Sequence, residues 1–338
     1  MKVLRKILKW TGISITFLLL LILLAGLSFR LFSPSPHLPQ GELINVGDFQ
    51  LHINVSGEQK EGQATVVIEA GAGLSTEYYH WLHEGLKDSL RVVRYDRAGL
   101  GHSDASSTPR DPATIAKELH TLLENAGETP PYILAGHSLG GAYIRLFAEL
   151  YPEEVASLVF LDATHPEQVE RLHAPTATSF KYRSYVFLLG AFAILGDVGV
   201  LGSYDRMSGH ILTQDGLPKT ANDRITDFLL NGQYVRGFRK EIQSYHSTLE
   251  RVADMKYLGD LPIRVFTATV IHKESYRARG IDPEEHLANK IAAQREFTDL
   301  STNGKQILME GNHSNIFTDQ EHAEVICAEI LKVVDELE

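Results

Sequence analysis

A serine framed by glycines lies between an apolar run and a helical pattern, and this arrangement constrains the fold more than any other part of the chain. The residues are Gly136-His137-Ser138-Leu139-Gly140-Gly141, preceded by the apolar run Tyr132–Ala135 and followed by the helical stretch Ala142–Leu150. In a strand-turn-helix context, G-x-S-x-G holds the serine hydroxyl on a strained turn at the end of a sheet. The following helix N-terminus offers free N–H groups beside that hydroxyl. The segment therefore predicts a nucleophile, Ser138.

Apolar runs alternate with helical patterns along most of the chain after Gly41. The predicted strands are Thr65–Ile68, Arg91–Tyr95, Tyr132–Ala135, Leu158–Leu161, Ile263–Thr267 and Gln306–Met309. The predicted helices include Tyr78–Ser89, Pro112–Asn125 and Gln320–Leu337, and a hairpin is predicted from Glu42–Val46 and Gln50–Val55. Such alternation is typical of an α/β fold with a mostly parallel sheet covered by helices on both faces.

The alternation stops between residues 165 and 259, where no strand pattern is visible. We expect this stretch to form a helical cap over one end of the sheet, with residues 41–164 and 260–338 forming the core. The cap contains an apolar run of 11 residues, Tyr185–Leu195. This run is too short to span a bilayer, and we expect it to belong to a core or a groove.

The N-terminal segment is basic and apolar, unlike the rest of the chain. Thr11–Phe29 is uncharged over 19 residues, about 28 Å as a helix at roughly 1.5 Å per residue, which matches the hydrocarbon core of a membrane. Four basic residues precede it and Arg30 alone follows closely, so the positive-inside rule predicts a cytoplasmic N-terminus and an extracytoplasmic body. Residues 1–40 are thus predicted to be a cytoplasmic stub, a membrane anchor at 11–29 and a proline-rich spacer. The alternative is a cleaved signal peptide and a secreted body.

Composition excludes several classes of function. The chain of 338 residues has 32 basic and 43 acidic residues, a net charge of −11, which argues against a nucleic-acid partner. Cys327 is the only cysteine, so a disulfide framework and a cysteine-based zinc site are excluded. The spacing of His272, Glu274 and His286 fits no zinc signature, and no phosphate-binding or dinucleotide-binding glycine loop is present. We expect neither a metal nor a cofactor.

Two further motifs accompany the serine in a fixed order. Ala70-Gly71-Ala72-Gly73 follows the predicted strand Thr65–Ile68, and Tyr95-Asp96-Arg97-Ala98-Gly99-Leu100-Gly101-His102-Ser103 contains D-x-x-G-x-G-x-S after the next strand. With the G-x-S-x-G turn, these motifs resemble the α/β-hydrolase superfamily from about residue 42 to residue 337, closest to its membrane-tethered or secreted members with a serine nucleophile. Ala70 stands where that family usually has histidine.

The resemblance implies a chain order of serine, acid and then histidine. His313 follows the last predicted strand and is the expected base, whereas His322 lies inside the predicted terminal helix and fits less well. Two carboxylates compete for the acid: Asp162, at the end of an earlier strand, is favoured over Glu274, which follows the usual strand.

An oxyanion hole is expected from the backbone N–H groups of Ala72 and Leu139. We expect Asp96 and Arg97 to stabilise their turn rather than to touch substrate. His102 and His137 are further candidates for the lining of the pocket.

These assignments predict a serine hydrolase without a cofactor. It would cleave a carboxylic ester or related acyl bond of a small, apolar substrate through an acyl-enzyme intermediate. An amidase or peptidase, an acyltransferase, and a hydrolase-fold receptor or scaffold with little turnover are the alternatives, because one fold hosts many functions.

Overall fold

The structure, a computed structural model, describes residues 1–33, 40–209, 213–254 and 257–338. Eight strands form one sheet in the order β1-β2-β4-β3-β5-β6-β7-β8, in which β1 and β2 are antiparallel to their neighbours and the remaining strands are parallel. The strands are β1 (Glu42–Asn45), β2 (Gln50–Ser56), β3 (Thr65–Glu69), β4 (Val92–Tyr95), β5 (Tyr132–His137), β6 (Val155–Leu161), β7 (Ile263–Ala268) and β8 (Gly304–Met309). This arrangement confirms the predicted α/β-hydrolase fold.

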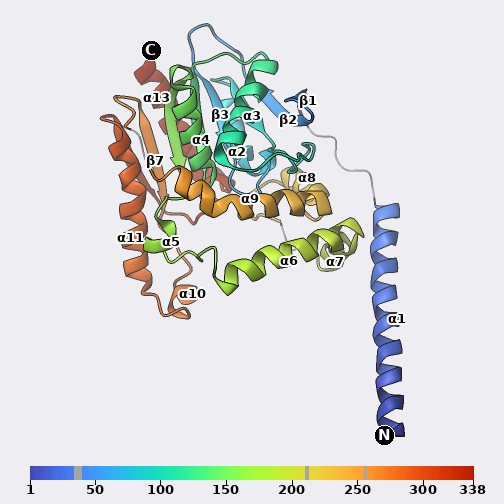
Figure 1. The fold of residues 1–338 in the computed structure, drawn as a ribbon. Coiled ribbons are helices and arrows are strands. Elements are labelled where there is room, and N and C mark those ends of the chain that lie inside the picture. The colour runs from blue at the N-terminus through green and yellow to red at the C-terminus, as the bar shows by residue number, and fades with distance from the viewer. Residues whose placement is uncertain (34–39, 210–212, 255–256) are drawn as a thin grey trace.

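Helices cover both faces of the sheet (Figure 1). They are α2 (His80–Leu86), α3 (Pro112–Asn125), α4 (Gly140–Leu150), α11 (Pro283–Arg295), α12 (Asn315–Thr318) and α13 (Gln320–Leu337), with short 3-10 turns η1 (Thr76–Tyr79), η2 (Pro152–Glu154) and η3 (Glu296–Leu300). Side chains of β3 alternate between the two faces: Val66 and Ile68 pack into one apolar cluster and Val67 into the other. The period of two therefore places one core on each side of the sheet.

The segment between β6 and β7 is helical and lies over one end of the sheet. It contains α5 (Gln168–Arg171), α6 (Phe180–Asp197), α7 (Val200–Met207), α8 (Lys219–Leu229) and α9 (Gly232–Arg251). Another short helix, α10 (Lys273–Arg277), follows β7. In Figure 1, α9 lies next to the sheet and α6 lies outside α9.

The apolar run in α6 departs from the prediction that it would belong to a core or groove. Leu189 and Ala193 pack against Val235 of α9, but Phe187 is 73% exposed and Ile194 is 65% exposed. The run is apolar around the helix, whereas α9 covers one face of it, so the opposite face has no protein against it among the described residues.

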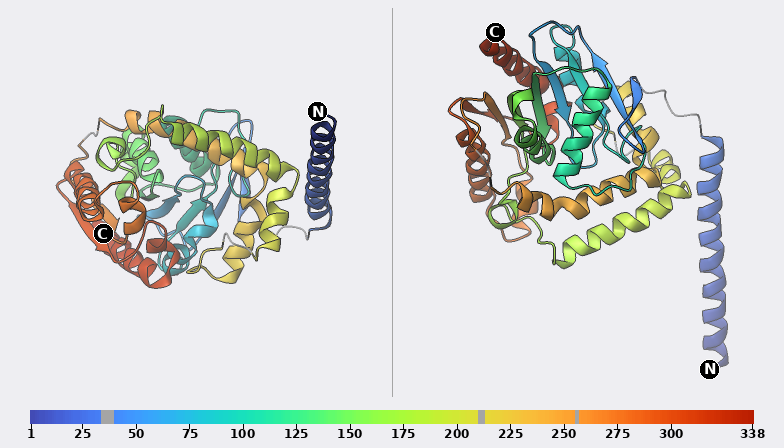
Figure 2. Two further views of the ribbon diagram at one scale, coloured as in Figure 1. Left: turned by 90° about the horizontal axis from the view of Figure 1, so that it is seen from below. Right: turned by 45° about the horizontal axis from the view of Figure 1, so that its top comes forward.

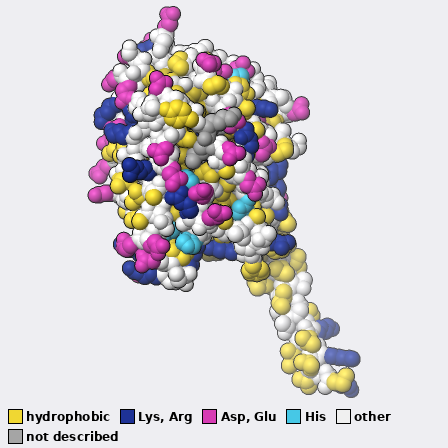
Figure 3. Space-filling view, turned by 60° about the vertical axis from the view of Figure 1, so that its left-hand side comes forward, with side chains coloured by type: hydrophobic (Ala, Val, Ile, Leu, Met, Phe, Trp, Pro, Cys, Tyr) yellow, Lys and Arg dark blue, Asp and Glu magenta, His cyan; other side chains and the backbone are white. Residues whose placement is uncertain are grey.

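Helix α1 (Lys2–Phe32) projects from the body as a single long rod (Figures 1 and 2). It is long and apolar enough to cross a membrane. Figure 3 shows its apolar surface and the basic side chains gathered at its free end. Its C-terminal part contacts α7, and Gly26 is its one buried residue.

Candidate active site

Ser138 lies on the tight turn between β5 and α4, at the carboxyl end of the sheet. Its φ of 52° is a strained, left-handed conformation for a residue with a side chain. Backbone hydrogen bonds hold the turn: Ser138 N–H donates to Leu161 O at 3.2 Å, and Thr164 N–H donates to Ser138 O at 2.8 Å. A Cβ at Gly140 would lie 2.5 Å from the Glu69 carbonyl oxygen, so only glycine lets α4 approach β3 this closely.

Asp162 and His313 are joined by a short hydrogen bond. Asp162 follows β6, has a φ of 45° and is buried, and its Oδ2 lies 2.6 Å from Nδ1 of His313. The other carboxylate oxygen accepts from the backbone N–H of Ala268 at 3.0 Å. This geometry orients the imidazole so that its Nε2 is free for another partner.

A lysine also contacts the carboxylate of Asp162. Nζ of Lys290, on α11, donates to Oδ2 at 2.8 Å and to the Ala268 carbonyl at 2.9 Å. Burial alone would raise the pKa of Asp162, but the hydrogen bond from His313 and the charge of Lys290 hold the pKa well below its usual range. The carboxylate is therefore ionised at neutral pH.

The competing carboxylate, Glu274, lies elsewhere. It is exposed in α10 and makes no contact with His313 among the described residues. The structure brings Asp162, not Glu274, to the imidazole.

Ser138 Oγ lies 3.5 Å from the hydroxyl of Thr164, and Ser138 and His313 line the same cavity.

His137 is buried and does not line this cavity. Its Nε2 lies 3.0 Å from the backbone carbonyl of His313, and its Nδ1 lies 3.1 Å from the hydroxyl of Tyr79. Burial lowers the pKa of His137 well below its ordinary value, and the nearby His313 lowers it further. A neutral His137 therefore donates from Nε2 and accepts at Nδ1, which supports the loop that carries His313.

The glycine-rich loop after β3 lies directly against the serine. A Cβ at Gly71 would lie 3.3 Å from the Cβ of Ser138, and Gly71 N–H donates to the Tyr79 hydroxyl at 2.8 Å. The side chains of Ala72 and Leu139 share a small apolar cluster with Tyr143. The backbone N–H groups of Ala72 and Leu139 donate no hydrogen bond within the described part of the chain.

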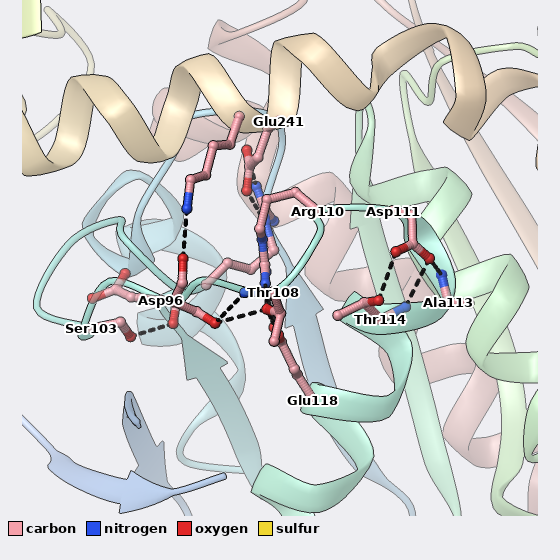
Figure 4. A network of polar contacts seen from close by, with 12 residues as sticks. Asp96, Ser103, Thr108, Arg110, Asp111, Ala113, Thr114, Glu118 and Glu241 are labelled. Atoms are coloured by element: carbon pink, nitrogen blue, oxygen red, sulfur yellow. Dashed lines mark hydrogen bonds and ion pairs between the residues drawn. The ribbon is translucent and has the colours of Figure 1, made fainter. Parts of the chain in front are cut away.

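A buried ion network fixes that loop from two sides. The Arg97 guanidinium donates to Glu69 at 2.6 Å, and to the Ala70 and Gly71 carbonyls at 2.6 and 2.7 Å. Glu241 of α9 accepts from Arg97 Nε at 2.7 Å and from the backbone N–H of Gly73 at 2.9 Å. Figure 4 shows Glu241 reaching from α9 into this network. Glu241 therefore links the cap to the glycine-rich loop through hydrogen bonds.

Asp96 stabilises its turn, as its sequence context suggests. Its carboxylate is fully buried, lies 2.9 Å from Nδ1 of His52, and accepts from the backbone N–H groups of Thr76 and His102 at 2.8 and 3.1 Å. His102 lies outside the cavity lining, as does Arg97.

The cavity at Ser138 has a volume of about 930 Å³. Its lining includes the catalytic candidates Ser138, Asp162 and His313, and it reaches out to Lys181 at the start of α6 and Arg279 after α10. The volume lies at the upper end of the range for small-molecule sites.

One other group has the geometry of a metal site within the described residues. Ligand atoms of His165, Glu167 and Glu296 lie within 4.8 Å of one another. Arg171 pairs with both carboxylates, at 3.2 and 2.6 Å. This single guanidinium offsets one of the two carboxylate charges that would attract a cation.

Two residues of the site, Lys290 and Glu241, were not predicted from the sequence. They lie 128 residues from Asp162 and 144 residues from Arg97, respectively. Glu241 falls on the buried face of α9, and a charge at such a position is the one signal that could have indicated its role.

A model of the alpha/beta hydrolase fold family matches residues 64–245, more than half of the chain, so the protein belongs to the α/β-hydrolase family. Among curated proteins it is 26% identical to the uncharacterized protein YbdG of Bacillus subtilis over 194 residues, 56% of this chain and 59% of that protein. It is 31% identical over 137 residues to human (lyso)-N-acylphosphatidylethanolamine lipase, 37% of this chain and 38% of that enzyme. The chain thus spans less than two thirds of these relatives.

The fold is similar to that of the epoxide hydrolase CorEH, with a TM-score of 0.63 and 17% identity over 88% of this chain and 99% of that one. At this identity the likeness concerns the fold alone. The family match supports a hydrolase.

Proposed function

We propose that the protein is a serine hydrolase that cleaves a carboxylic ester or related acyl bond, with Ser138 as nucleophile, His313 as base and Asp162 as the orienting acid. The observation that carries the proposal is the 2.6 Å contact between a buried Asp162 carboxylate and Nδ1 of His313, beside a serine on a strained turn. An orienting acid leaves Nε2 of the imidazole to act on the serine hydroxyl.

The reaction has two acyl-transfer steps. Ser138 Oγ attacks the substrate carbonyl while Nε2 of His313 takes the hydroxyl proton, and the backbone N–H groups of Ala72 and Leu139 stabilise the oxyanion. The ester C–O bond then breaks and the leaving alcohol receives the proton from His313. Water, deprotonated by His313, attacks the acyl-enzyme, and the carboxylic acid leaves as Ser138 regains its proton.

The unpaired N–H groups and the 3.5 Å distance from Ser138 Oγ to Thr164 suit a site whose hydrogen bonds tighten when substrate binds. The cavity lining is mostly polar, and its large aliphatic side chains are Leu172, Val270 and Ile271. An apolar acyl or alcohol group of the substrate would pack against these three residues.

We further propose that α1 anchors the protein in a membrane with its N-terminus cytoplasmic and its body extracytoplasmic. The basic residues before the uncharged stretch support this orientation. Protease protection in vesicles of known sidedness tests it: digestion from the cytoplasmic side should leave the body intact.

Labelling of the full-length protein in detergent with a fluorophosphonate probe tests the chemistry. We expect wild type to be labelled and Ser138→Ala and His313→Ala to be unlabelled, because the probe reacts with an activated serine. Folded wild-type protein that resists the probe, or labelling that survives in Ser138→Ala, would overturn the proposal. A receptor or scaffold would retain ligand binding without turnover.

A further inference from the structure

Helix α6 presents an apolar face to its surroundings. The exposed large side chains along it are Phe180, Tyr185, Phe187, Leu188, Phe192 and Ile194. The opposite face packs on α9 through Leu189 and Ala193. A continuous exposed apolar face of this kind is unusual for a soluble surface and marks a site of interaction.

The position of α1 indicates what covers this face. Gly26 of α1 lies against the α6–α7 junction, where a Cβ on it would lie 2.5 Å from the Val198 carbonyl oxygen. Phe29 packs on Gly202 of α7, and Arg30 donates to the Asp197 carbonyl. These contacts fall at the end of the uncharged stretch Thr11–Phe29, so the α6–α7 junction lies at the level where α1 would leave the hydrocarbon.

The orientation of α6 relative to α1 also bears on what covers its exposed face. In Figure 1 and in the right-hand view of Figure 2, α6 runs across the direction of α1, on the outer side of α9, while α1 continues past it, away from the sheet. The axes of α6 and α7 differ by 85°, so the pair does not form one straight span. The exposed face of α6 therefore points to the side on which α1 would enter the bilayer.

The charges fit a lipid surface. The exposed basic residues Lys181 and Arg183 are at the start of α6, and no acidic residue occurs from residue 180 to residue 196. An apolar helix face with basic residues at its edge is typical of a helix that lies in the membrane interface beside anionic headgroups.

The catalytic cavity reaches this same end of α6. Its lining includes Lys181 of α6 and Pro175 in the segment before it, as well as Ser138. A molecule that leaves the bilayer beside the start of α6 would therefore meet the cavity without crossing bulk water.

We propose that α6 lies in the interface of the membrane that α1 anchors, on the body's side, and that the cavity takes its substrate, a membrane lipid with an acyl ester, from that leaflet. The substrate class rests on the proposed serine-hydrolase function; the placement of α6 in the interface does not.

Depth-dependent fluorescence tests the placement. Phe187→Cys and Ile194→Cys, each labelled with an environment-sensitive dye, are compared with Val325→Cys on α13, a similarly apolar position that is 44% exposed. The native Cys327 is buried, and burial raises the pKa of its thiol to about 12, so it should not react. The full-length proteins are reconstituted in vesicles of phosphatidylcholine with a minor fraction of phosphatidylglycerol.

We expect lipids that carry a quencher to quench the dyes at residues 187 and 194 several-fold more than the dye at 325. Equal quenching at all three positions would overturn the proposal. Dyes at 187 and 194 that are shielded from water but not quenched by lipid would also overturn it, because a protein partner would then cover α6.

A double variant, Phe187→Ser with Ile194→Ser, tests the delivery of substrate. We expect its kcat/KM for a long-chain ester lipid in vesicles to fall at least tenfold, with kcat/KM for a short, water-soluble p-nitrophenyl ester unchanged. A matched Val325→Ser variant should leave both values unchanged. Unaltered vesicle turnover in the double variant would refute delivery from the leaflet.

The two proposals fail separately. Wild-type protein that cleaves neither ester and resists the fluorophosphonate probe would refute the serine-hydrolase function and, with it, the lipid substrate, whereas the dye measurement would still decide where α6 lies.

Discussion

Replacing Glu241 with alanine should damage both stability and catalysis, because this one side chain connects the cap to the glycine-rich loop beside Ser138. Glu241 is fully buried and accepts three hydrogen bonds: two from Arg97, at 2.7 and 3.0 Å, and one from Gly73 N–H at 2.9 Å. Removing one partner of a buried ion pair costs about 3 to 5 kcal/mol. Arg97 keeps Glu69 and two carbonyl partners, so we expect the lower end, about 3 kcal/mol.

For the body, residues 41–338, such a loss corresponds to a fall in Tm of roughly 5 °C. The variant also loses the hydrogen bond from Gly73 N–H, which helps to hold the glycine-rich loop in place. Because this loop carries Ala72, whose N–H is a proposed oxyanion donor, we expect kcat to fall by up to about 100-fold. The assay combines thermal unfolding of the full-length protein in detergent with turnover of a soluble p-nitrophenyl ester, measured well below the Tm of the variant.

Lys240→Ala is the matched control, on the next position of α9. Its Nζ donates to the Ser106 carbonyl at 2.6 Å, outside the Glu241 network, and its loss should change stability by less than about 1 kcal/mol. A Tm for Glu241→Ala that equals that of Lys240→Ala would refute the buried-pair argument. A lower Tm with unchanged kcat would refute the connection to the loop.

Three further outcomes are expected. Asp162→Asn should lower kcat about 10⁴-fold in the ester assay, because the ionised acid that orients His313 is lost. Glu274→Ala should leave kcat near the wild-type value. A large loss of kcat in Glu274→Ala and none in Asp162→Asn would identify Glu274 as the acid instead. Burial lowers the pKa of His83 to about 4, so the unfolded chain protonates first, and the free energy of unfolding should fall by roughly 3 kcal/mol from pH 6.5 to pH 4 in chemical denaturation. His83→Gln should flatten that slope, and an unchanged slope would contradict it. Gly140→Ala should destabilise by about 2 kcal/mol or more, because its Cβ would clash with the Glu69 carbonyl of β3. Gly190→Ala, whose Cβ would meet only the Arg239 side chain at an ordinary contact distance of 3.4 Å, should stabilise α6 by up to about 1 kcal/mol. Equal effects in thermal unfolding would refute the packing argument.

Local patterns were sufficient for the architecture. The alternation of apolar runs and helical stretches predicted the parallel core, and the glycines around Ser138 predicted a turn whose φ of 52° the structure contains. The uncharged stretch Thr11–Phe29 predicted a helix that is long enough to cross a membrane. These features depend on residues within a few positions of one another, so periodicity and turn chemistry determine them.

The choice between Asp162 and Glu274 required the tertiary structure. His313 lies 151 residues after Asp162, and the two meet because β6, β7 and β8 are neighbours whose carboxyl ends share one edge of the sheet. Glu274 follows the central strand of these three, but α10 carries it away from the imidazole into solvent. Sequence position alone ranked both carboxylates as possible because each follows a strand.

The sequence by itself determined which segments are strands, which helix is apolar enough for a membrane, and where the strained turn that carries Ser138 lies. Only the tertiary structure decided that Lys290 contacts the acid, that Glu241 ties the cap to the loop, and that the apolar run of α6 is exposed rather than buried. The physical reason is that the hydrophobicity of a side chain determines only that it avoids water. Packing between segments far apart in the sequence decides whether other protein residues cover that side chain or leave it exposed.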